Sequence, residues 1–305
     1  MTKISVLVLT YNHSAYIKQC IDSILLQSVN ADLEIIIGDD CSTDGTQLLL
    51  KNLYADKNNV SLILREENLG ASLNFIDIIS NATGDYLVYI DGDDYMLPGK
   101  LDAQLKVFEC NPEVNLVHHN VDIVDSNDSC VRVGNIKKGV FGDINDLLKQ
   151  CQTNIQSCAV MLRNRNVIWK DLIPEDSKIQ DMPFIYNLLG SGRIIYINKS
   201  LSAYRVHSNS VSRTTNLLIL EEWARFFIEQ TQLCPTVKMS SIRTSLKVSY
   251  LRDVCLYIKE GDYSGAKKTL DIANKFPLGF NRHIYFQYAL ILKVLFTIGY
   301  KRIIK

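Results

Sequence analysis

The stretch Tyr86-Leu-Val-Tyr-Ile-Asp91-Gly-Asp93-Asp94 decides how this chain folds, because an apolar run ends there abruptly in three carboxylates. Five consecutive apolar or aromatic residues are typical of a strand that is buried on both faces of a parallel sheet. Such a strand delivers the residues behind it to the edge where open α/β sheets bind ligands. Three aspartates at one edge repel one another, and a divalent cation such as Mg²⁺ or Mn²⁺ is the usual compensation. Taken alone, the triplet is also compatible with an ordinary acidic loop.

Strand and helix patterns alternate over the first 110 residues. We predict strands at residues 4–9, 33–37, 60–64 and 86–90. We predict helices capped by Ser14, started by Thr43 or Asp44, spanning 71–80, and running from Pro98 to about Cys110. The apolar stripes of the first two helices are Ile17, Cys20, Ile21, Ile24 and Leu25, and then Leu48, Leu49 and Leu53. Alternation at this period predicts right-handed βαβ units, and therefore an α/β fold with a mostly parallel sheet.

The second half of the chain has a looser pattern. Strands are predicted at residues 116–124, 131–136, 157–162 and 193–197, with helices at 145–149 and 182–189. Beyond about Asn216 the sequence is helical in pattern, and residues 250–270 resemble a helical hairpin that turns at Gly261. We therefore expect two domains, an α/β domain over residues 1–215 and a helical region over residues 216–305.

The composition excludes some classes of partner. The chain has 33 basic and 33 acidic residues and a pI near 6.9, so it has no basic field to attract nucleic acid. Its eight cysteines form no Cys-x-x-Cys pair, which favours reduced thiols in a cytosolic protein. The sequence enters its first strand at Ile4 without a secretory signal, and we therefore expect the protein to work in the cytoplasm.

Polar residues follow all four N-terminal strands. The turn after the first strand combines an aromatic ring with polar groups that can hold a planar base, although an ordinary turn would look the same. The paired carboxylates after the second strand can bond the edge of a base and the ribose hydroxyls. Because the ends of parallel strands meet at one edge of a sheet, these residues are candidates for one ligand site. The candidates are Thr10, Tyr11, Asn12, Asp39, Asp40, Asn68, Gly70, Asp91, Gly92 and Asp93.

Five motifs occur in a fixed order and spacing: Leu9-Thr-Tyr-Asn12, Asp39-Asp-Cys-Ser-Thr-Asp-Gly45, Asn68-Leu-Gly70, Gly84-Asp-Tyr86 and Asp91-Gly-Asp-Asp94. Together they resemble the inverting glycosyltransferases of family 2, which have the GT-A fold. Further along, Gln180-Asp181 matches the usual Glu-Asp of that family, and Tyr204-Arg-Val-His-Ser-Asn-Ser210 is similar to its Tyr-Arg-x-His-x-x-Ser segment. The resemblance covers roughly residues 1–215. Gln180 departs from the common acid, which puts a supporting hydrogen bond in doubt rather than the base.

The resemblance implies a nucleoside-diphosphate sugar as donor, with uridine by the habit of the family. At ~5 Å and an effective dielectric near 20, each contact between a phosphate and an aspartate of this edge costs ~3 kcal/mol. Mn²⁺ or Mg²⁺ between Asp93 and the phosphates reverses that sign and stabilises the departing nucleotide. By similarity, Asp91 faces the ribose or the water shell of the metal. His207 is a candidate metal ligand, with a polar residue in a surface loop as the alternative.

Two further roles follow from the resemblance. Asp181 is the expected general base, since a carboxylate before the helix at 182–189 can remove the proton of the acceptor hydroxyl as it attacks the anomeric carbon. The alternative is that Asp181 only caps this helix. Arg205 either pairs with a phosphate or forms a structural ion pair that locks the cluster of aspartates. The other four histidines match no motif position and are treated as structural.

Residues 284–300 are strongly apolar and are followed by Lys301, Arg302 and Lys305. The segment is shorter than the ~20 residues of a spanning helix. It either docks on the core of the protein or lies at a membrane surface, with its basic end attracted to anionic lipid. Peripheral membrane contact through residues 284–305 suits a lipid-linked glycan acceptor, as in O-antigen or capsule synthesis, a setting that the resemblance implies.

Three functions compete for this sequence. The first is an active, metal-dependent inverting glycosyltransferase of the hexosyltransferase type. The alternative is a sugar-nucleotide-binding assembly protein without turnover, and the retained Asp91, Asp93 and Asp181 argue against it. A nucleotidyltransferase would need a Gly-rich, basic phosphate loop after the first strand, whereas Thr10-Tyr-Asn-His-Ser14 contains no Gly, Lys or Arg.

Overall fold

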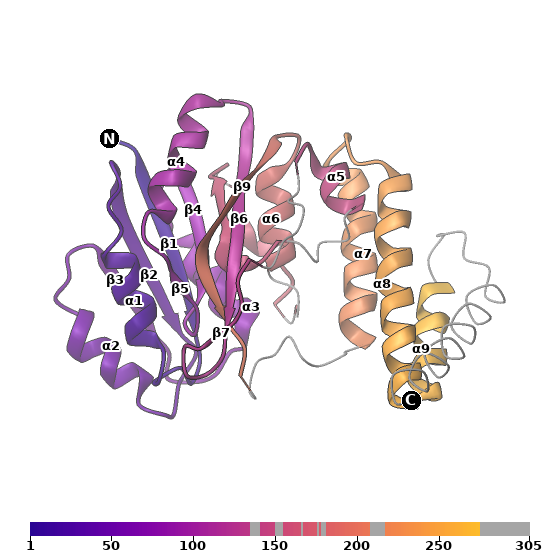
Figure 1. Cartoon of the computed structure of the whole chain (residues 1–305), viewed down its shortest axis with the longest axis horizontal. Coiled ribbons are helices and arrows are strands. Elements are labelled where there is room, and N and C mark those ends of the chain that lie inside the picture. Colours follow the sequence, from indigo (N-terminus) through magenta and orange to yellow (C-terminus); the bar gives the residue numbers. More distant parts are fainter. Residues whose placement is uncertain are drawn as a thin grey trace, which may run out of the picture. The chain divides into compact units, whose positions relative to one another are not determined.

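The computed structural model describes residues 1–134, 141–149, 155–165, 167–175, 177, 181–207 and 217–274 of the chain (Figure 1). The chain divides into two compact units. The first contains Met1–Ile144 and Thr153–Ser210, and the second contains Asn145–Gln152 and Val211–Lys305. The short helix α5 (Ile144–Lys149) therefore belongs mostly to the second unit, although its position in the sequence is within the α/β half.

Strand and helix alternate along the first half of the first unit, as predicted. The elements are β1 (Lys3–Thr10), α1 (Ile17–Leu25), β2 (Asp32–Asp39), α2 (Thr46–Tyr54), β3 (Val60–Leu64), α3 (Ala71–Ser80), β4 (Tyr86–Asp91), β5 (Tyr95–Met96) and α4 (Lys100–Cys110). The predicted limits of β3 and α3 agree with the structure at both ends. The two-residue strand β5 was not predicted, because it forms only by pairing with β9, more than 100 residues later.

The strands of the described residues form one nine-stranded sheet in the order β3-β2-β1-β4-β8-β6-β9-β5, with β7 paired to β6. Its later members are β6 (Val114–Val124), β7 (Cys130–Arg132), β8 (Val160–Arg163) and β9 (Arg193–Arg205). The first four strands run parallel, which confirms that prediction, whereas β8 runs antiparallel to β4 and β6. In the central register, Thr10 pairs with Asp39 and Leu9 pairs with Asp91. The sheet therefore brings the ends of β1, β2 and β4 to one edge.

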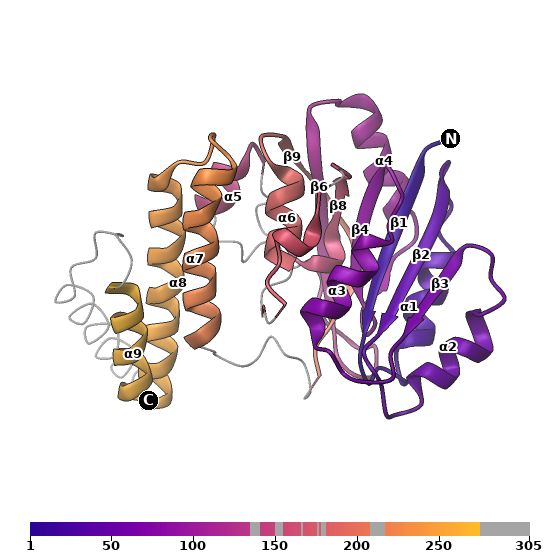
Figure 2. The same ribbon diagram turned by 180° about the vertical axis from the view of Figure 1, so that it is seen from behind.

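Helices cover both faces of this sheet. Strand side chains alternate between the faces, so β4 points Val88 to one side and Tyr89 to the other. On the first side, Val88 joins Ile21 of α1 and Leu105 of α4 in one apolar cluster. On the second side lie α3 and α6 (Asp181–Leu189), which Figure 2 shows on the same face. There Phe75 contacts Phe184 and Tyr89 edge to face, with ring centroids 5.5 Å and 5.1 Å apart.

The starts of two helices differ from the prediction. Helix α1 begins after Tyr16 and not at Ser14, because the carbonyl of His13 accepts the N–H groups of Tyr16 and Ile17. The N–H of Ser14 instead donates a hydrogen bond to the side-chain carboxylate of Asp44. Pro98 lies before α4 and not in its first turn, since the cap residue is Gly99 with φ of 83°. That left-handed conformation is one that glycine adopts without strain.

The apolar face predicted for α2 was wrong in part, since Leu49 packs against the apolar core but Leu48 and Leu53 are exposed. Leu50 and Tyr54 are buried, whereas Leu48 is 62% exposed and Leu53 is 40% exposed. The helix starts at Thr46, whose side chain is buried, and residues four apart in a helix share a face. Position 46 therefore selects positions 50 and 54. The strand predicted at 157–162 also begins differently, as a 3₁₀ turn (Ser157–Ala159) before β8, and a second such turn spans Trp169–Asp171.

The second unit is helical, as expected. It contains α7 (Leu217–Leu233), α8 (Met239–Glu260) and α9 (Tyr263–Asn274) in addition to α5. The predicted hairpin is confirmed, since α8 ends at Gly261 with φ of 83°. An apolar cluster of Val254, Ile258, Ala266 and Leu270 joins its two helices. In the part of the chain that the structure describes, no helix has the length and apolarity to cross a bilayer. Residues 284–305 lie outside that part.

Candidate active site

The loop after β1 is joined to the loop after β2. Asn12 has φ of 57°, a left-handed conformation in which Asn is more common than most residues. Its N–H donates to Ser42 Oγ at 2.8 Å, and its Oδ1 accepts the N–H of Thr43 at 2.9 Å. Tyr11 stays 46% exposed beside this junction, whereas Thr10 is buried. Asn12 therefore braces the two loops, and the ring of Tyr11 is available for a planar ligand.

Asp39 and Asp40 are buried at the end of β2, and both carboxylates bond to protein groups. Asp39 Oδ1 accepts the N–H of Ser42 at 2.9 Å and the side-chain amide of Gln47 at 2.8 Å. Asp40 accepts two backbone N–H groups, that of Leu69 at 2.8 Å and that of Gly70 at 2.9 Å. Asn68 Nδ2 donates to the carbonyl of Asp40 at 3.0 Å. These two aspartates thus shape the loops that contain the other predicted residues, including Asn68 and Gly70.

Asp91 is held by two hydroxyl groups at the end of β4. Tyr89 Oη donates to its Oδ1 at 2.6 Å, and Ser157 Oγ donates to its Oδ2 at 3.3 Å. Burial raises the pKa of Asp91 to about 7, and the charge of Asp93 adds to that rise. The hydrogen bond from Tyr89 acts in the opposite direction and favours the ionised form. Asp91 is therefore a carboxylate whose charge is only partly compensated by the protein.

Asp93 and His207 come together from two distant segments. His207 Nε2 lies 2.9 Å from Asp93 Oδ2, and the imidazole stacks on Tyr16 with ring centroids 5.4 Å apart. Gly92 lies against Thr10 and His13, since a Cβ at this position would be 2.9 Å from Thr10 Oγ1 and from His13 Nδ1. Any larger residue at position 92 would displace one of them. The carboxylate and imidazole that the sequence predicts as metal ligands are thus in direct contact.

The donor atoms of this pair fit a divalent cation. A carboxylate oxygen and an imidazole nitrogen suit Mn²⁺, and a metal of this kind commonly takes its remaining ligands from substrate phosphates and water. Asp91, the third predicted ligand, uses both its oxygens in bonds to Tyr89 and Ser157. Among the residues that the structure describes, no three His, Cys, Asp or Glu side chains are placed to hold a metal together. The metal prediction therefore rests on two protein ligands, Asp93 and His207.

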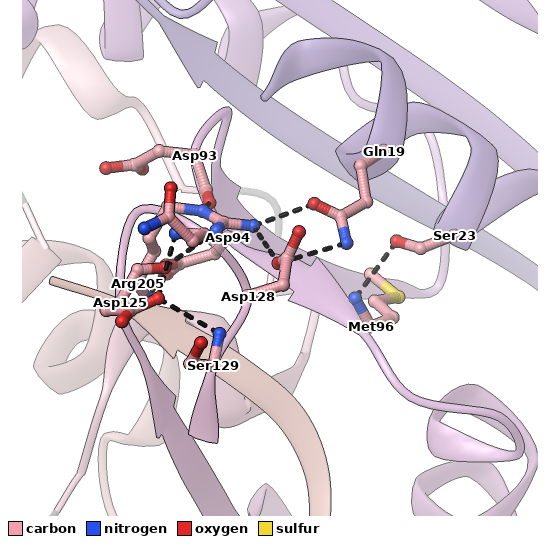
Figure 3. A network of polar contacts seen from close by, with 10 residues as sticks. Gln19, Ser23, Asp93, Asp94, Met96, Asp125, Asp128, Ser129 and Arg205 are labelled. Carbon is pink, nitrogen blue, oxygen red and sulfur yellow. Dashed lines mark hydrogen bonds and ion pairs between the residues drawn. The ribbon is translucent and has the colours of Figure 1, made fainter. Parts of the chain in front are cut away.

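Arg205 is buried at the centre of a polar network behind this pair (Figure 3). Its Nε donates to the carbonyl of Asp93 and its Nη1 to the carbonyl of Asp125, at 2.8 Å and 2.9 Å. Its Nη2 donates to Gln19 Oε1 and to Asp128 Oδ1, each at 2.7 Å. Two roles were possible for Arg205, and these contacts fit the structural ion pair that holds the cluster of aspartates in place. They leave no part of the side chain exposed to a phosphate.

Asp94 faces away from solvent beneath this network. Its Oδ1 accepts the backbone N–H of Arg205 at 2.8 Å. Burial, with the charges of Asp93 and Asp91, raises the pKa of Asp94 well above its usual range. Asp94 is therefore a buried, structural member of the triplet.

Asp181 is the first residue of α6, where the sequence places the general base. Burial raises the pKa of its carboxyl, and hydrogen bonds from the backbone N–H groups of Met182 and of Asp181 itself act against that rise. Its charge also raises the pKa of Tyr89 and of Asp91, so the three groups share one electrostatic environment. The bond from Met182 is compatible with a helix cap, while a carboxylate of raised pKa near the β4 aspartates is compatible with a base.

Sequence reasoning missed several residues of this site. From the sequence, Tyr89 is one residue of an apolar strand, although its hydroxyl reaches Asp91. The sequence predicts a structural role for His13, yet this residue lies against Gly92. Burial lowers the pKa of His13, and the nearby charges of Asp93 and His207 also affect it. The two-residue spacing of Tyr89 and Asp91 was a usable signal, because alternate residues of a strand share a face.

The sequence is similar to those of known glycosyltransferases. The family described as glycosyl transferase family 2 matches residues 5–172. A candidate teichuronic acid biosynthesis glycosyltransferase of Bacillus subtilis, TuaG, is 28% identical over 211 residues, which are 68% of this chain and 81% of that protein. An uncharacterised glycosyltransferase of Nostoc sp. is 33% identical over 129 residues, 42% of this chain and 39% of its own length. The chain spans between 35% and 39% of the length of the first curated relatives that it matches.

The structure is similar to that of a staphylococcal protein. The crystal structure of S. aureus TarS residues 1–349 in complex with UDP-GlcNAc superposes with a TM-score of 0.60 and 18% sequence identity. The superposition covers 90% of this chain and 92% of that one. At this level of identity the similarity establishes the fold, a GT-A sheet with a helical C-terminal region, which confirms the fold predicted from the sequence.

Proposed function

This chain belongs to glycosyl transferase family 2, and from that premise we propose that it moves a sugar from a UDP-sugar to a hydroxyl of a glycan acceptor with inversion at the anomeric carbon. One observation carries the proposal. The fold brings Asp91, Asp93 with His207, and Asp181 into one electrostatic environment at the end of β4. A structurally similar protein has been crystallised with UDP-GlcNAc and with UDP, which supports uridine as the base of the donor.

In the proposed reaction, Asp181 is the base. As the acceptor oxygen bonds to the anomeric carbon, the bond from that carbon to the phosphate oxygen breaks, and UDP leaves from the opposite face. The proton of the acceptor hydroxyl passes to the carboxylate of Asp181. Because burial raises the pKa of Asp181, its carboxylate is a stronger base than that of an exposed aspartate.

We propose that Asp93 and His207 hold Mn²⁺ or Mg²⁺ between the protein and the donor diphosphate. When bound, such a cation neutralises charge that develops on the departing nucleotide. The role of the protein is to hold the Asp93 carboxylate and the His207 imidazole next to each other. The predicted nucleotide contacts of Thr10, Tyr11, Asn12, Asp39, Asp40, Asn68, Gly70, Asp91 and Gly92 belong to the same proposal, with Asp39 and Asp40 acting through the loops that they hold.

For the acceptor we propose a lipid-linked glycan of a bacterial surface polysaccharide, such as O-antigen or capsule. The name of the B. subtilis relative, which refers to teichuronic acid, supports a surface polymer. We also propose that the protein acts at the cytoplasmic face of the membrane and contacts it through residues 284–305. The basis for this is the apolar and basic pattern of that segment.

The test is release of nucleotide from a panel of nucleotide sugars by the purified full chain, with Mn²⁺, Mg²⁺ or chelator and with glycan acceptors. We expect release from one or more UDP-sugars, and an inverted anomeric carbon in the product by NMR. Asp181→Asn is the matched control, because it is nearly isosteric and should bind UDP without transfer. Tight UDP binding by the wild type without release from any donor would instead favour the non-catalytic binding protein.

A further inference from the structure

We infer that Asp128 and Gln19 are positioning residues of the donor site, which act on Asp93 through the buried guanidinium of Arg205. The inference rests on the proposed function and adds two residues to it. Neither residue belongs to a motif of the family that the sequence displays. They come from separate places in the fold, Gln19 from α1 and Asp128 from the turn between β6 and β7.

The first step concerns the charge of Arg205. The side chain has no exposure to solvent, and it lies over the rings of Tyr16 and Tyr95 with its guanidinium carbon 4.5 Å and 5.6 Å from their centroids. Among the described residues its single ion pair is with Asp128, at 2.7 Å, and its other acceptors are carbonyl and amide oxygens. A buried cation without a counter-charge is strongly destabilised. Asp128 is therefore the residue that makes this burial of Arg205 possible.

The second step concerns how Asp128 and Gln19 hold the guanidinium in place. Both N–H groups of Nη2 are used, one toward Gln19 Oε1 and one toward Asp128 Oδ1, and Gln19 Nε2 donates to the same Asp128 oxygen at 3.3 Å. Figure 3 shows this closed triangle. Asp128 has φ of 63°, and its turn is braced by Asp125 Oδ1, which accepts the N–H groups of Asn127 and Ser129. Side chain and backbone are thus both constrained.

The third step leads from the guanidinium to the reacting groups. Three bonds join the turn after β4 to the end of β9: Arg205 Nε to the Asp93 carbonyl, Arg205 N–H to Asp94 Oδ1, and His207 Nε2 to Asp93 Oδ2. Their lengths are 2.8, 2.8 and 2.9 Å. A displaced guanidinium moves the backbone of Asp93 and so separates its carboxylate from His207. A displacement of about 1 Å at a reacting group can lower a rate by about 10²-fold.

The experiment compares Asp128→Asn with Asp102→Asn in the full chain. Asp102 is a matched control, since it is also a half-exposed aspartate whose carboxylate forms an ion pair at 2.7 Å, with Lys106 on α4. For each protein we would measure kcat, the KM of the UDP-sugar, the Mn²⁺ concentration that gives the half-maximal rate, and the thermal unfolding midpoint. We expect Asp128→Asn to raise the required Mn²⁺ concentration at least about 5-fold and to lower kcat/KM about 10-fold or more. Asp102→Asn should match the wild type.

A charge exchange separates positioning from simple loss of stability. In Gln19→Glu/Asp128→Asn, the carboxylate and the amide trade places around Nη2, so the guanidinium regains a counter-charge and the amide regains an acceptor. The kcat/KM of the double variant should return to within about 3-fold of the wild-type value. Gln19→Glu alone places two carboxylates side by side, and its kcat/KM should stay below that range. A purely structural role would lower the unfolding midpoint of Asp128→Asn without changing its Mn²⁺ requirement.

The outcomes distinguish the two proposals. A wild type that releases nucleotide, together with an Asp128→Asn variant whose Mn²⁺ requirement and kcat/KM equal those of Asp102→Asn, would overturn the positioning role alone. Failure of the charge exchange to restore activity in a folded double variant would do the same. A wild type that binds or turns over no nucleotide sugar would overturn the proposed function and this inference with it.

Discussion

The aspartates at the ends of β2 and β4 look alike in sequence but differ in their surroundings. Asp39 and Asp40 after β2 accept hydrogen bonds from Ser42, Gln47, Leu69 and Gly70. After β4, by contrast, burial and mutual repulsion raise the pKa values of Asp91 and Asp94. Hydrogen-bond donors of the protein compensate the charges of Asp39 and Asp40, so these two residues hold the surrounding loops in place. The aspartates at the end of β4 are left short of compensation by protein donors, which a cation or a proton can supply.

The comparison predicts that changes after β4 act on the reaction and changes after β2 act on stability. The largest effect is expected for Asp93→Asn, which replaces a charged metal ligand by a neutral amide. Transfer should fall about 10³-fold, a scale typical of losing one group that stabilises developing charge. The thermal unfolding midpoint without ligand should change little. Wild-type turnover in Asp93→Asn, or full activity in excess chelator, would contradict the metal assignment.

Asp181→Asn should lower transfer by about 10²-fold or more while UDP affinity survives, because a general base is needed only for chemistry. The pH profile gives a second test. The base must be ionised, and burial raises the pKa of Asp181, so the rate of the wild type should fall on the acid side at a higher pH than for an exposed aspartate. The residual rate of Asp181→Asn should lack this acid limb. A comparable loss of UDP affinity would place Asp181 in the nucleotide site instead, and retained transfer would leave it a helix cap.

Asp40→Asn tests the other half of the comparison. The variant faces the N–H groups of Leu69 and Gly70 with only one acceptor oxygen, and the second N–H then meets an amide donor. The free energy of unfolding should fall by about 1–3 kcal/mol, the usual cost of a buried group left without its partner. Denaturant unfolding measures this loss, and kcat with saturating donor should stay near that of the wild type. A stable Asp40→Asn protein with lost kcat would reverse the roles assigned to the two groups of aspartates.

His207→Ala removes the partner of Asp93 without touching the aspartates. If the imidazole is a ligand, the metal concentration for the half-maximal rate should rise about 10-fold. The measurement is a Mn²⁺ titration of the rate at saturating donor. An unchanged titration would mean that His207 is a polar residue of a surface loop.

The smallest effect is expected for Tyr89→Phe, which removes the hydroxyl that favours ionised Asp91. Burial raises the pKa of Asp91 to about 7 and the hydrogen bond from Tyr89 opposes that rise, so the pKa of Asp91 should be higher in the variant. Less Asp91 is then ionised at pH 7, so its proposed contact with the ribose hydroxyls should weaken, and donor affinity should fall a few-fold there and recover near pH 9. Titration of UDP affinity against pH checks the shift. Ser157→Ala provides a comparison, since its longer contact of 3.3 Å to the same carboxylate should matter less.

Local pattern was sufficient for much of the first unit. The limits of β3 and α3 could be predicted because apolar periodicity and flanking turn residues are properties of adjacent positions. The loops at the ends of β1, β2 and β4 could be placed at one edge because parallel connection leaves few alternatives. The buried face of α2 could not be predicted in this way, since Leu48 and Leu53 are as apolar as Leu50 and the burial of Thr46 depends on what packs against it.

The sequence by itself determined the family, the GT-A fold and the edge of the sheet where the motif residues gather, because these depend on short motifs whose spacing survives in the chain. Only the tertiary structure decided which carboxylates are compensated, and which residues hold Arg205. Compensation depends on donors far away in sequence, as when Asp128 and Gln19 meet a guanidinium from position 205. The energy of a charge depends on burial and on neighbours within a few ångströms, and neither quantity is a property of adjacent residues.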